Sequence, residues 1–140
     1  MNKRILVVED QEDNRQILRD LLGSIDIDMI EAHDGQAAVT QAAAHKPDLI
    51  LMDIQLPIMD GYEATRRIRQ SAGDRDIPII AMTANAMEGD RDACLAVGMN
   101  DYVSKPMRIQ NLVTVIDRLM PLVEERRAFK TNRPDHTGGI

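Results

Sequence analysis

The sequence predicts an α/β protein in which five parallel strands form one sheet with helices on both faces. Two observations lead to this prediction: short apolar runs alternate with longer stretches of helical spacing, and the clearest runs are apolar throughout. A run without polar alternation is typical of a strand that is buried on both faces, as in a parallel sheet. Right-handed crossovers then give a doubly wound sandwich, for which we expect the strand order 2-1-3-4-5 rather than a closed barrel.

The expected strands are the short apolar runs of this pattern. The runs "ILVV" and "DLILM" are the clearest, whereas "DMIEA" is a weaker candidate because acidic residues interrupt it. Pro78 lies near the start of its strand, where a missing N–H donor is tolerated. The expected strands are 5–8, 28–32, 48–52, 77–82 and 101–104.

Helices are expected between the strands, where apolar residues recur three and four positions apart. The first shows this spacing in "ILRDLLG" and ends at Gly23, a residue that often closes a helix. Gly89 weakens the fourth by roughly 1 kcal/mol relative to alanine, and the last carries a well-defined apolar stripe. The expected helices are the one that ends at Gly23, then 35–46, 62–72, 86–98 and 107–120.

The length of 140 residues suits one domain, which we expect at 1–120. After Pro121 the sequence becomes polar and ends in glycines. Residues 121–140 are therefore expected to extend the last helix by a turn or two and then to form a flexible tail. Apolar residues make up 44% of the chain and only three are aromatic, so aliphatic side chains and methionines must fill the core.

Charge and cysteine content exclude several classes of function. A formal net charge of −6 argues against direct binding of DNA, because phosphate binding needs a basic face. The single cysteine, Cys94, rules out an intrachain disulfide and favours a reducing compartment. The apolar run near the N-terminus is too short for a signal peptide, and no segment approaches the length of a membrane span. We therefore expect a cytoplasmic protein that does not insert into a membrane.

Polar residues follow four of the expected strands, at the edge where a doubly wound sheet binds its ligands. Glu9 and Asp10 follow the first strand, Asp53 the third, Thr83 the fourth and Lys105 the fifth. Taken alone, Asp10 could cap a helix, Asp53 could cap a turn and Lys105 could be a solvated surface residue. Their coincidence at one edge favours a shared chemistry of three carboxylates, an ammonium and a hydroxyl.

Crowded carboxylates disfavour one another's ionisation, and a divalent cation relieves that repulsion. Oxygen ligands without histidine or cysteine suit Mg²⁺ rather than zinc. A Mg²⁺ held by Asp10, Asp53 and, directly or through water, Glu9 would leave one oxygen of Asp53 free to attack phosphorus and form an acyl phosphate. The metal and Lys105 would neutralise the phosphoryl oxygens, to which Thr83 would donate a hydrogen bond.

These residues occur in stretches that resemble the receiver domain of two-component response regulators, over residues 3–120. The stretches are "ILVVED" with its acid pair, "LILMDIQLPIMDGYE" with the phosphoacceptor, "PIIAMTAN" with the hydroxyl and "DYVSKP" with the lysine. The resemblance implies the flavodoxin-like strand order and a phosphorylation-activated switch rather than an enzyme. It also implies that Asp53 takes its phosphoryl group from a phosphohistidine of a sensor histidine kinase or a histidine phosphotransfer protein.

The resemblance assigns roles to further residues. The backbone carbonyl of Gln55 would complete the protein ligands of the metal, and the bond between Lys105 and Pro106 would be cis. Gln55 and Asn85 would tune the lifetime of the acyl phosphate. Glu9 stands where an aspartate is commoner, and this change keeps a carboxylate for the metal.

The resemblance also implies how the signal leaves the site. Phosphorylation would draw Thr83 inward, and Tyr102 would rotate into the vacated space. The surface formed by the fourth helix, the fifth strand and the fifth helix would then change its contacts with a downstream protein target.

Three other interpretations are weaker. A phosphatase of the haloacid dehalogenase type also uses a strand-end aspartate with Mg²⁺, but it needs a second aspartate where this chain has Gln55. A receiver-like scaffold that is not phosphorylated would lack the acid pair, the acceptor or the lysine. A flavodoxin relative would carry a Ser/Thr-rich phosphate loop in place of "EDQEDNRQ".

The sequence leaves open whether the chain is a single-domain response regulator or a receiver excised from a hybrid histidine kinase. The start "MNKRILVVED" favours a complete protein, whereas "MTANAM" and "SKPM" also resemble receivers fused to hybrid kinases. The output of a single-domain receiver must pass through protein contacts. Association into a homodimer is open as well.

Overall fold

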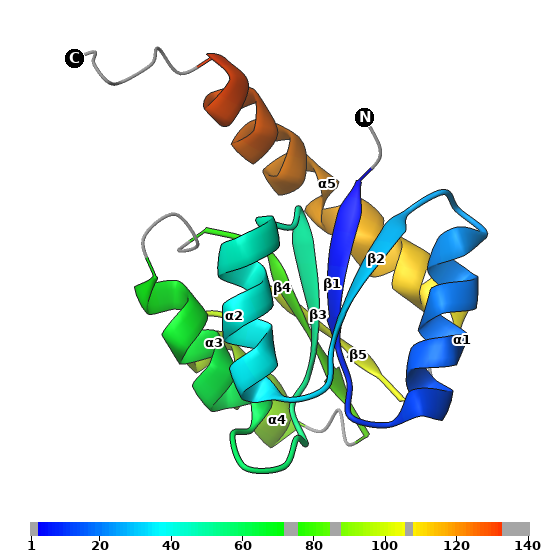
Figure 1. Ribbon diagram of the computed structural model, residues 1–140, viewed down its shortest axis with the longest axis vertical. Helices are drawn as coiled ribbons and strands as arrows, with labels where there is room; N and C mark the ends of the chain where they lie inside the picture. The colour runs from blue at the N-terminus through cyan, green and yellow to red at the C-terminus, as the bar shows by residue number, and fades with distance from the viewer. Residues whose placement is uncertain (1–2, 72–75, 85–87, 106–107, 133–140) are drawn as a thin grey trace.

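The computed structural model describes residues 3–71, 76–84, 88–105 and 108–132, in which strands and helices alternate (Figure 1). The strands are β1 (Arg4–Val8), β2 (Asp28–Ala32), β3 (Leu49–Asp53), β4 (Ile79–Thr83) and β5 (Asp101–Ser104). The helices are α1 (Glu12–Gly23), α2 (Gly35–His45), α3 (Gly61–Gln70), α4 (Glu88–Ala96) and α5 (Ile109–Asn132). All strand pairs are parallel and the order is β2-β1-β3-β4-β5, so the predicted fold class is confirmed.

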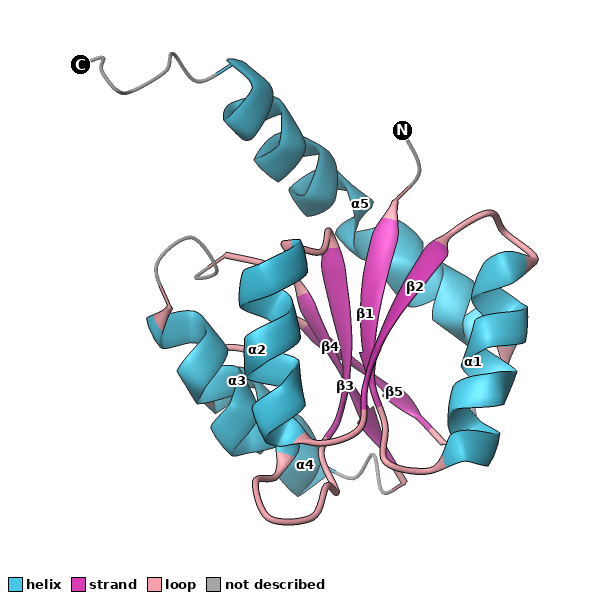
Figure 2. Cartoon of the chain, viewed as in Figure 1, coloured by secondary structure: helices cyan, strands magenta, loops and turns pink. Residues whose placement is uncertain are grey.

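Helices cover both faces of the sheet (Figure 2). Two layers of apolar side chains fill the spaces between the sheet and these helices. Because side chains alternate along a strand, Leu6 and Val8 of β1 face the layer of α2, α3 and α4. Ile5 and Val7 face the other layer, which belongs to α1 and α5. The central strands β3 and β4 are buried along their whole length, which explains their uninterrupted apolar sequences. The edge strand β2 is only partly buried, and its weaker pattern follows from that.

Caps and a glycine set the ends of several helices. The side chain of Asp34 accepts a hydrogen bond from the N–H of Ala37 at the start of α2, at 2.7 Å. Gly98 follows α4 with φ +100°, a conformation that glycine adopts without strain, and its N–H donates to the carbonyl of Leu95 at 3.1 Å. The predicted start of this helix falls within 85–87, which lie outside the described residues.

Helix α5 continues through Pro121, further than the turn or two expected from the sequence. A proline inside a helix removes one hydrogen bond and crowds the preceding turn, at a cost of about 3 kcal/mol. Packing offsets this cost, because Val123 is only 1% exposed against the sheet. Three ion pairs join this half of α5 to the edge where the strands begin: Arg126–Asp76 (2.7 Å), Lys3–Glu124 (2.9 Å) and Arg127–Asp48 (3.4 Å). Neither α5 nor any other helix of the described segments is long and apolar enough to cross a membrane.

We expect Val123→Ala to lower the free energy of unfolding by about 2 kcal/mol, because the substitution leaves a buried site partly empty. The matched control is Leu122→Ala in the same turn, whose side chain is 44% exposed and whose loss should cost less than about 0.5 kcal/mol. Urea denaturation measures both. Equal losses would show that the second half of α5 does not pack on the sheet in solution.

Candidate functional site

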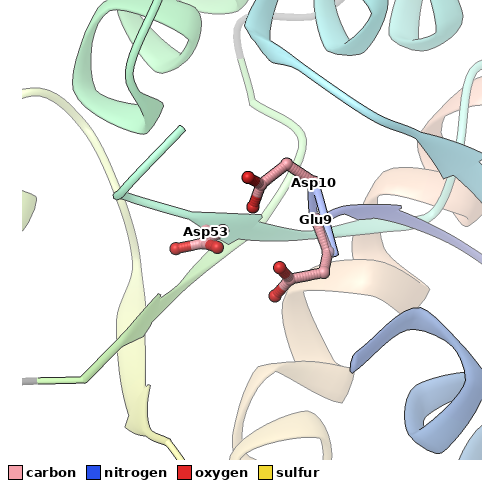
Figure 3. A group of neighbouring side chains, drawn as sticks. All are labelled: Glu9, Asp10 and Asp53. Atoms are coloured by element: carbon pink, nitrogen blue, oxygen red, sulfur yellow. The ribbon is translucent and has the colours of Figure 1, made fainter. Parts of the chain in front are cut away.

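Three carboxylates meet at the carboxyl edge of the sheet, where β1 and β3 lie side by side (Figure 3). β1 ends at Val8, so Glu9 and Asp10 come directly after it, and Asp53 is the last residue of β3. Ligand oxygens from the three side chains lie within 4.8 Å of one another. Glu9 and Asp53 are 1% and 2% exposed, whereas Asp10 is exposed to solvent. The strand order reverses at this point of the sheet, which is where doubly wound folds bind ligands.

Lys105 joins the two buried carboxylates. Its Nζ lies 2.8 Å from Oε1 of Glu9 and 2.8 Å from Oδ2 of Asp53. The backbone N–H of Lys105 donates to the carbonyl of Thr83 at 2.8 Å, so the end of β4 helps to hold this lysine. The structure therefore brings together Glu9, Asp10, Asp53 and Lys105, the four charged residues that the sequence placed at one edge.

Burial and hydrogen bonding set the charges of these groups. Burial raises the pKa of Asp53, and the negative charge of Glu9 adds to this effect. Hydrogen bonds from Lys105 and from the N–H of Gln55 act in the opposite direction but do not outweigh burial; the nitrogen of Gln55 lies 2.9 Å from Oδ1 of Asp53. Burial also acts to raise the pKa of Glu9, but hydrogen bonds from Lys105 and from the N–H of Gln11 lower it overall. The nitrogen of Gln11 lies 3.1 Å from Oε2 of Glu9. Burial acts to lower the pKa of Lys105, and its bonds to both carboxylates outweigh that effect and raise it. A further cation at this edge would therefore favour the ionised form of Asp53.

Asp10 and Asp53 could have had only local roles, as a helix cap and a turn cap. The N-cap position of α1 belongs to Gln11, with no side-chain capping bond, so Asp10 does not cap the helix. Asp53 does accept a bond from the N–H of Gln55 two residues on, as a turn residue would, but it also bonds to Lys105. Each oxygen of Asp53 thus accepts one hydrogen bond and keeps a second lone pair for a metal or for phosphorus.

The remaining predicted residues lie around this cluster or outside the described chain. Thr83 is buried at the end of β4, and Tyr102 of β5 is half-buried against the core layer of α2, α3 and α4. Gln55 is exposed in the loop after β3. Asn85 and Pro106 lie outside the described residues, so the tuning role of Asn85 and the cis bond stay predictions.

Gly61 allows α3 to begin directly against the end of β3. A Cβ added at Gly61 would lie 2.3 Å from the carbonyl oxygen of Asp53 and 2.8 Å from Cα of Ile54. The N–H of Gly61 donates to the carbonyl of Ile54 at 3.1 Å. Nothing local in the sequence around Gly61 shows that two backbones touch here.

A buried arginine, Arg15 of α1, also reaches the site and belongs to none of the predicted motifs. It is 6% exposed, and its Nη1 donates to the backbone carbonyl of Glu9 at 2.8 Å. Its spacing from Leu18 and Leu22, three and seven residues on, puts it on the buried face of α1. That spacing is the signal that could have revealed it.

The doubly wound sheet, the strand-end aspartate, the acid pair and the lysine define the receiver class of two-component signalling proteins. The model of the response regulator receiver domain family matches residues 5–117. The chain therefore belongs to that family. Members of the family are signalling switches rather than enzymes in the usual sense.

Individual relatives agree with this assignment. The polar-differentiation response regulator DivK of Brucella anthropi is 40% identical over 116 residues, which are 83% of this chain and 94% of that protein. The receiver domain of the sensor histidine kinase PA1611 of Pseudomonas aeruginosa is 42% identical to this chain, and the two structures have a TM-score of 0.80. The match covers 86% of this chain and 99% of that receiver domain. The Pseudomonas structure was solved with a magnesium ion coordinated in its active-site cleft. The chemotaxis protein CheY4 of Vibrio cholerae, at 24% identity, a TM-score of 0.81 and coverage of 84% and 98%, shares the fold.

We expect Gly61→Ala to lower the free energy of unfolding by about 2–3 kcal/mol, because the new methyl group must displace the backbone of Asp53. Gly23→Ala is the control, since no atom lies within 4 Å of a Cβ added there, and it should be neutral or stabilising by up to about 1 kcal/mol. Urea denaturation compares the two. Similar effects at both glycines would contradict the close approach at Gly61.

We expect Asp53→Asn to raise the free energy of unfolding at pH 7 by about 1 kcal/mol in the absence of metal, because it removes a buried charge. Since the folded-state pKa of Asp53 is raised, the wild type loses stability as the pH rises from the ordinary aspartate pKa of about 3.9 through the raised value. The advantage of Asp53→Asn should therefore shrink as the pH falls toward that ordinary value.

Thermal unfolding in a chelator across this pH range measures the difference. Asp60→Asn is the control, because Asp60 is an exposed helix cap and asparagine caps equally well. If Asp53→Asn were less stable than the wild type at pH 7, the bond to Lys105 would outweigh the cost of burial.

Proposed function

We propose that this chain is a phosphorylation-activated switch in which Asp53 accepts a phosphoryl group from a phosphohistidine of a sensor histidine kinase or a histidine phosphotransfer protein. The observation that carries the proposal is the buried carboxylate of Asp53 at a strand end, with the ammonium of Lys105 at 2.8 Å and two further carboxylates beside it. A carboxylate fixed in this way is suited to act as a nucleophile toward phosphorus. Membership of the receiver family supports the proposal.

The donor set at this edge fits a Mg²⁺ ion. Among the described residues, the group that could hold a metal consists of three carboxylates without histidine or cysteine, and such oxygen ligands are the ones Mg²⁺ prefers. We assign Glu9, Asp10, Asp53 and the backbone carbonyl of Gln55 as its protein ligands. Bound Mg²⁺ supplies positive charge that neutralises the carboxylates and the phosphoryl oxygens. The magnesium ion in the cleft of the Pseudomonas receiver supports this assignment.

The transfer forms one bond and breaks one. An oxygen of Asp53 uses a lone pair to bond to phosphorus, while the P–N bond of the donor breaks and its electron pair passes to the imidazole nitrogen. Lys105 balances the charge on the phosphoryl oxygens, and the hydroxyl of Thr83 donates a hydrogen bond to one of them. Water later cleaves the acyl phosphate in the same site. The protein therefore processes its own phosphoryl group and does not turn over a separate substrate.

The signal leaves the site through β4 and β5. Thr83 ends β4 and pairs in register with Ser104 of β5, two residues beyond the half-buried Tyr102. Movement of Thr83 toward the phosphoryl group frees space into which Tyr102 rotates. A groove of about 610 Å³ between α4, β5 and α5 is lined in part by Tyr102, Leu95 and Val115. This groove supports the α4–β5–α5 face as the contact surface for a downstream protein or a second copy of the chain.

The relatives suggest two settings for this receiver. We favour a single-domain response regulator, because the match with DivK spans 94% of that protein. A receiver of a hybrid histidine kinase is the alternative, supported by the 42% identity to a receiver that belongs to a sensor kinase. In both settings we expect the chain to act in the cytoplasm and not to bind DNA directly.

Labelling with acetyl phosphate and Mg²⁺ tests the acceptor. The wild type should gain the mass of one phosphoryl group and Asp53→Asn should not, because asparagine lacks the nucleophilic oxygen. Asp60→Asn, in the same β3–α3 loop, is the matched control and should be labelled like the wild type. Equal labelling of Asp53→Asn would refute Asp53 as acceptor, and labelling that persists in excess chelator would refute the metal requirement.

A further inference from the structure

We propose that Arg15 is a positioning residue of this site: its guanidinium holds the peptide between Glu9 and Asp10 and so fixes the acid pair for a bound Mg²⁺. This inference rests on the proposed function, because it names a residue that acts on the same site. Arg15 does not touch the metal or the phosphoryl group and acts only through the backbone of its neighbours.

Arg15 is a buried side chain whose two terminal nitrogens form hydrogen bonds, whereas its Nε forms none within the described residues. Its Nη1 donates to the carbonyl of Glu9 at 2.8 Å, and its Nη2 donates to Oε1 of Glu12 at 2.6 Å. Its Nε lies 3.3 Å from Oε1 of Glu31 on β2. A buried arginine is costly unless it is paired, and two carboxylates from different elements compensate it here. The two terminal nitrogens are thus held by different partners, and Nη1 is the one bonded to the residue that follows β1.

The bond to the Glu9 carbonyl matters most for Asp10. The carbonyl of Glu9 and the N–H of Asp10 belong to one planar peptide group, so fixing the oxygen also fixes the direction in which Asp10 leaves the chain. The N–H of Glu9 is held separately by the carbonyl of Ala32 at 3.1 Å. Asp10 is exposed and does not cap α1, so packing and capping do not orient it. Arg15 provides the anchor that Asp10 otherwise lacks.

Arg15 and Lys105 supply positive charge to the cluster in different ways. Lys105 binds carboxylate oxygens of Glu9 and Asp53, the atoms that a metal needs. Arg15 binds a backbone carbonyl instead, so it leaves every carboxylate oxygen of the acid pair available. The planar guanidinium of Arg15 directs its N–H groups in fixed directions, so it bonds the carbonyl of Glu9 and the carboxylate of Glu12 together, whereas a lysine ammonium acts as a rotatable point charge.

The chain contains a close control for this arginine. Arg19 lies one turn further along α1 and pairs with the same Glu31, at 2.7 Å. Its side chain is 35% exposed against 8% for Arg15, and its hydrogen bonds run to Glu31 and Gln16. Loss of Arg19 removes a cation near Glu31 but leaves the Glu9 carbonyl bonded to Arg15.

Titration calorimetry of the full chain with Mg²⁺ tests the inference without any phosphoryl transfer. Arg15→Met should weaken Mg²⁺ binding by about 10–100-fold, the usual effect of removing a group that orients a metal ligand. Arg19→Met should bind Mg²⁺ like the wild type. Arg15→Lys should recover only part of the loss, because it restores the charge without the fork. Equal affinities for Arg15→Met and the wild type, or equal losses for Arg15→Met and Arg19→Met, would overturn the inference.

A measurement on the wild type covers the case in which Arg15→Met does not fold. The side-chain ¹⁵N–¹H signal of Arg15 should shift as Mg²⁺ is added, and that of Arg19 should not. An Arg15 signal that stays unmoved at saturating Mg²⁺ would overturn the inference. Failure of the proposed function looks different, since the wild type itself would then bind no Mg²⁺ or Asp53→Asn would still be labelled.

Discussion

The ammonium of Lys105 between the carboxylates of Glu9 and Asp53 is the interaction on which the rest of this site depends. Two carboxylates that are almost fully buried repel each other and have lost most of their hydration, so they need a cation in the same space. Lys105 provides that cation at 2.8 Å from each. Even so, the pKa of Asp53 stays above its ordinary value, and this residual electrostatic strain is what a metal ion relieves. Binding of a cation would stabilise the ionised form of Asp53, so the charge of the site is coupled to metal binding.

The fold makes this arrangement rigid. The carboxyl ends of the parallel strands lie at one edge, and β3 is buried along its whole length, so Asp53 stands on an element that cannot shift easily. Backbone groups complete the frame, with the N–H of Gln55 on one oxygen of Asp53 and the start of α3 packed against its carbonyl at Gly61. Next to the neighbouring strand β1, Arg15 of α1 holds the carbonyl of Glu9, the residue that follows this strand. The reacting side chains are therefore positioned by main-chain contacts rather than by one another alone.

The two edges of the sheet differ in the balance of their acidic and basic side chains. At the carboxyl edge, three acids lie together and one lysine pairs with two of them, so the excess negative charge favours a cation. At the opposite edge, where the strands begin, acids and bases are matched in pairs, as in Arg126 with Asp76 and Lys3 with Glu124. These pairs fasten the second half of α5 beyond Pro121 and help to stabilise a helix that proline alone would weaken. The unbalanced edge is the one at which doubly wound folds bind their ligands, and the ion pairs at the opposite edge contribute to the stability of the fold.

The sequence by itself determined the fold class and the position of the carboxylate cluster, because apolar periodicity and the residues at strand ends are local features. They predicted the five strands, their order and the meeting of Asp10 and Asp53 at one edge. The family signature also lies in short, continuous stretches. Only the tertiary structure decided that Lys105 would bond to Glu9, 96 residues away, that Gly61 would contact the backbone at the end of β3, and that Arg15 would be buried against the site. These contacts join residues from different elements, and their distances depend on how helices pack on the sheet, which no single stretch of sequence specifies.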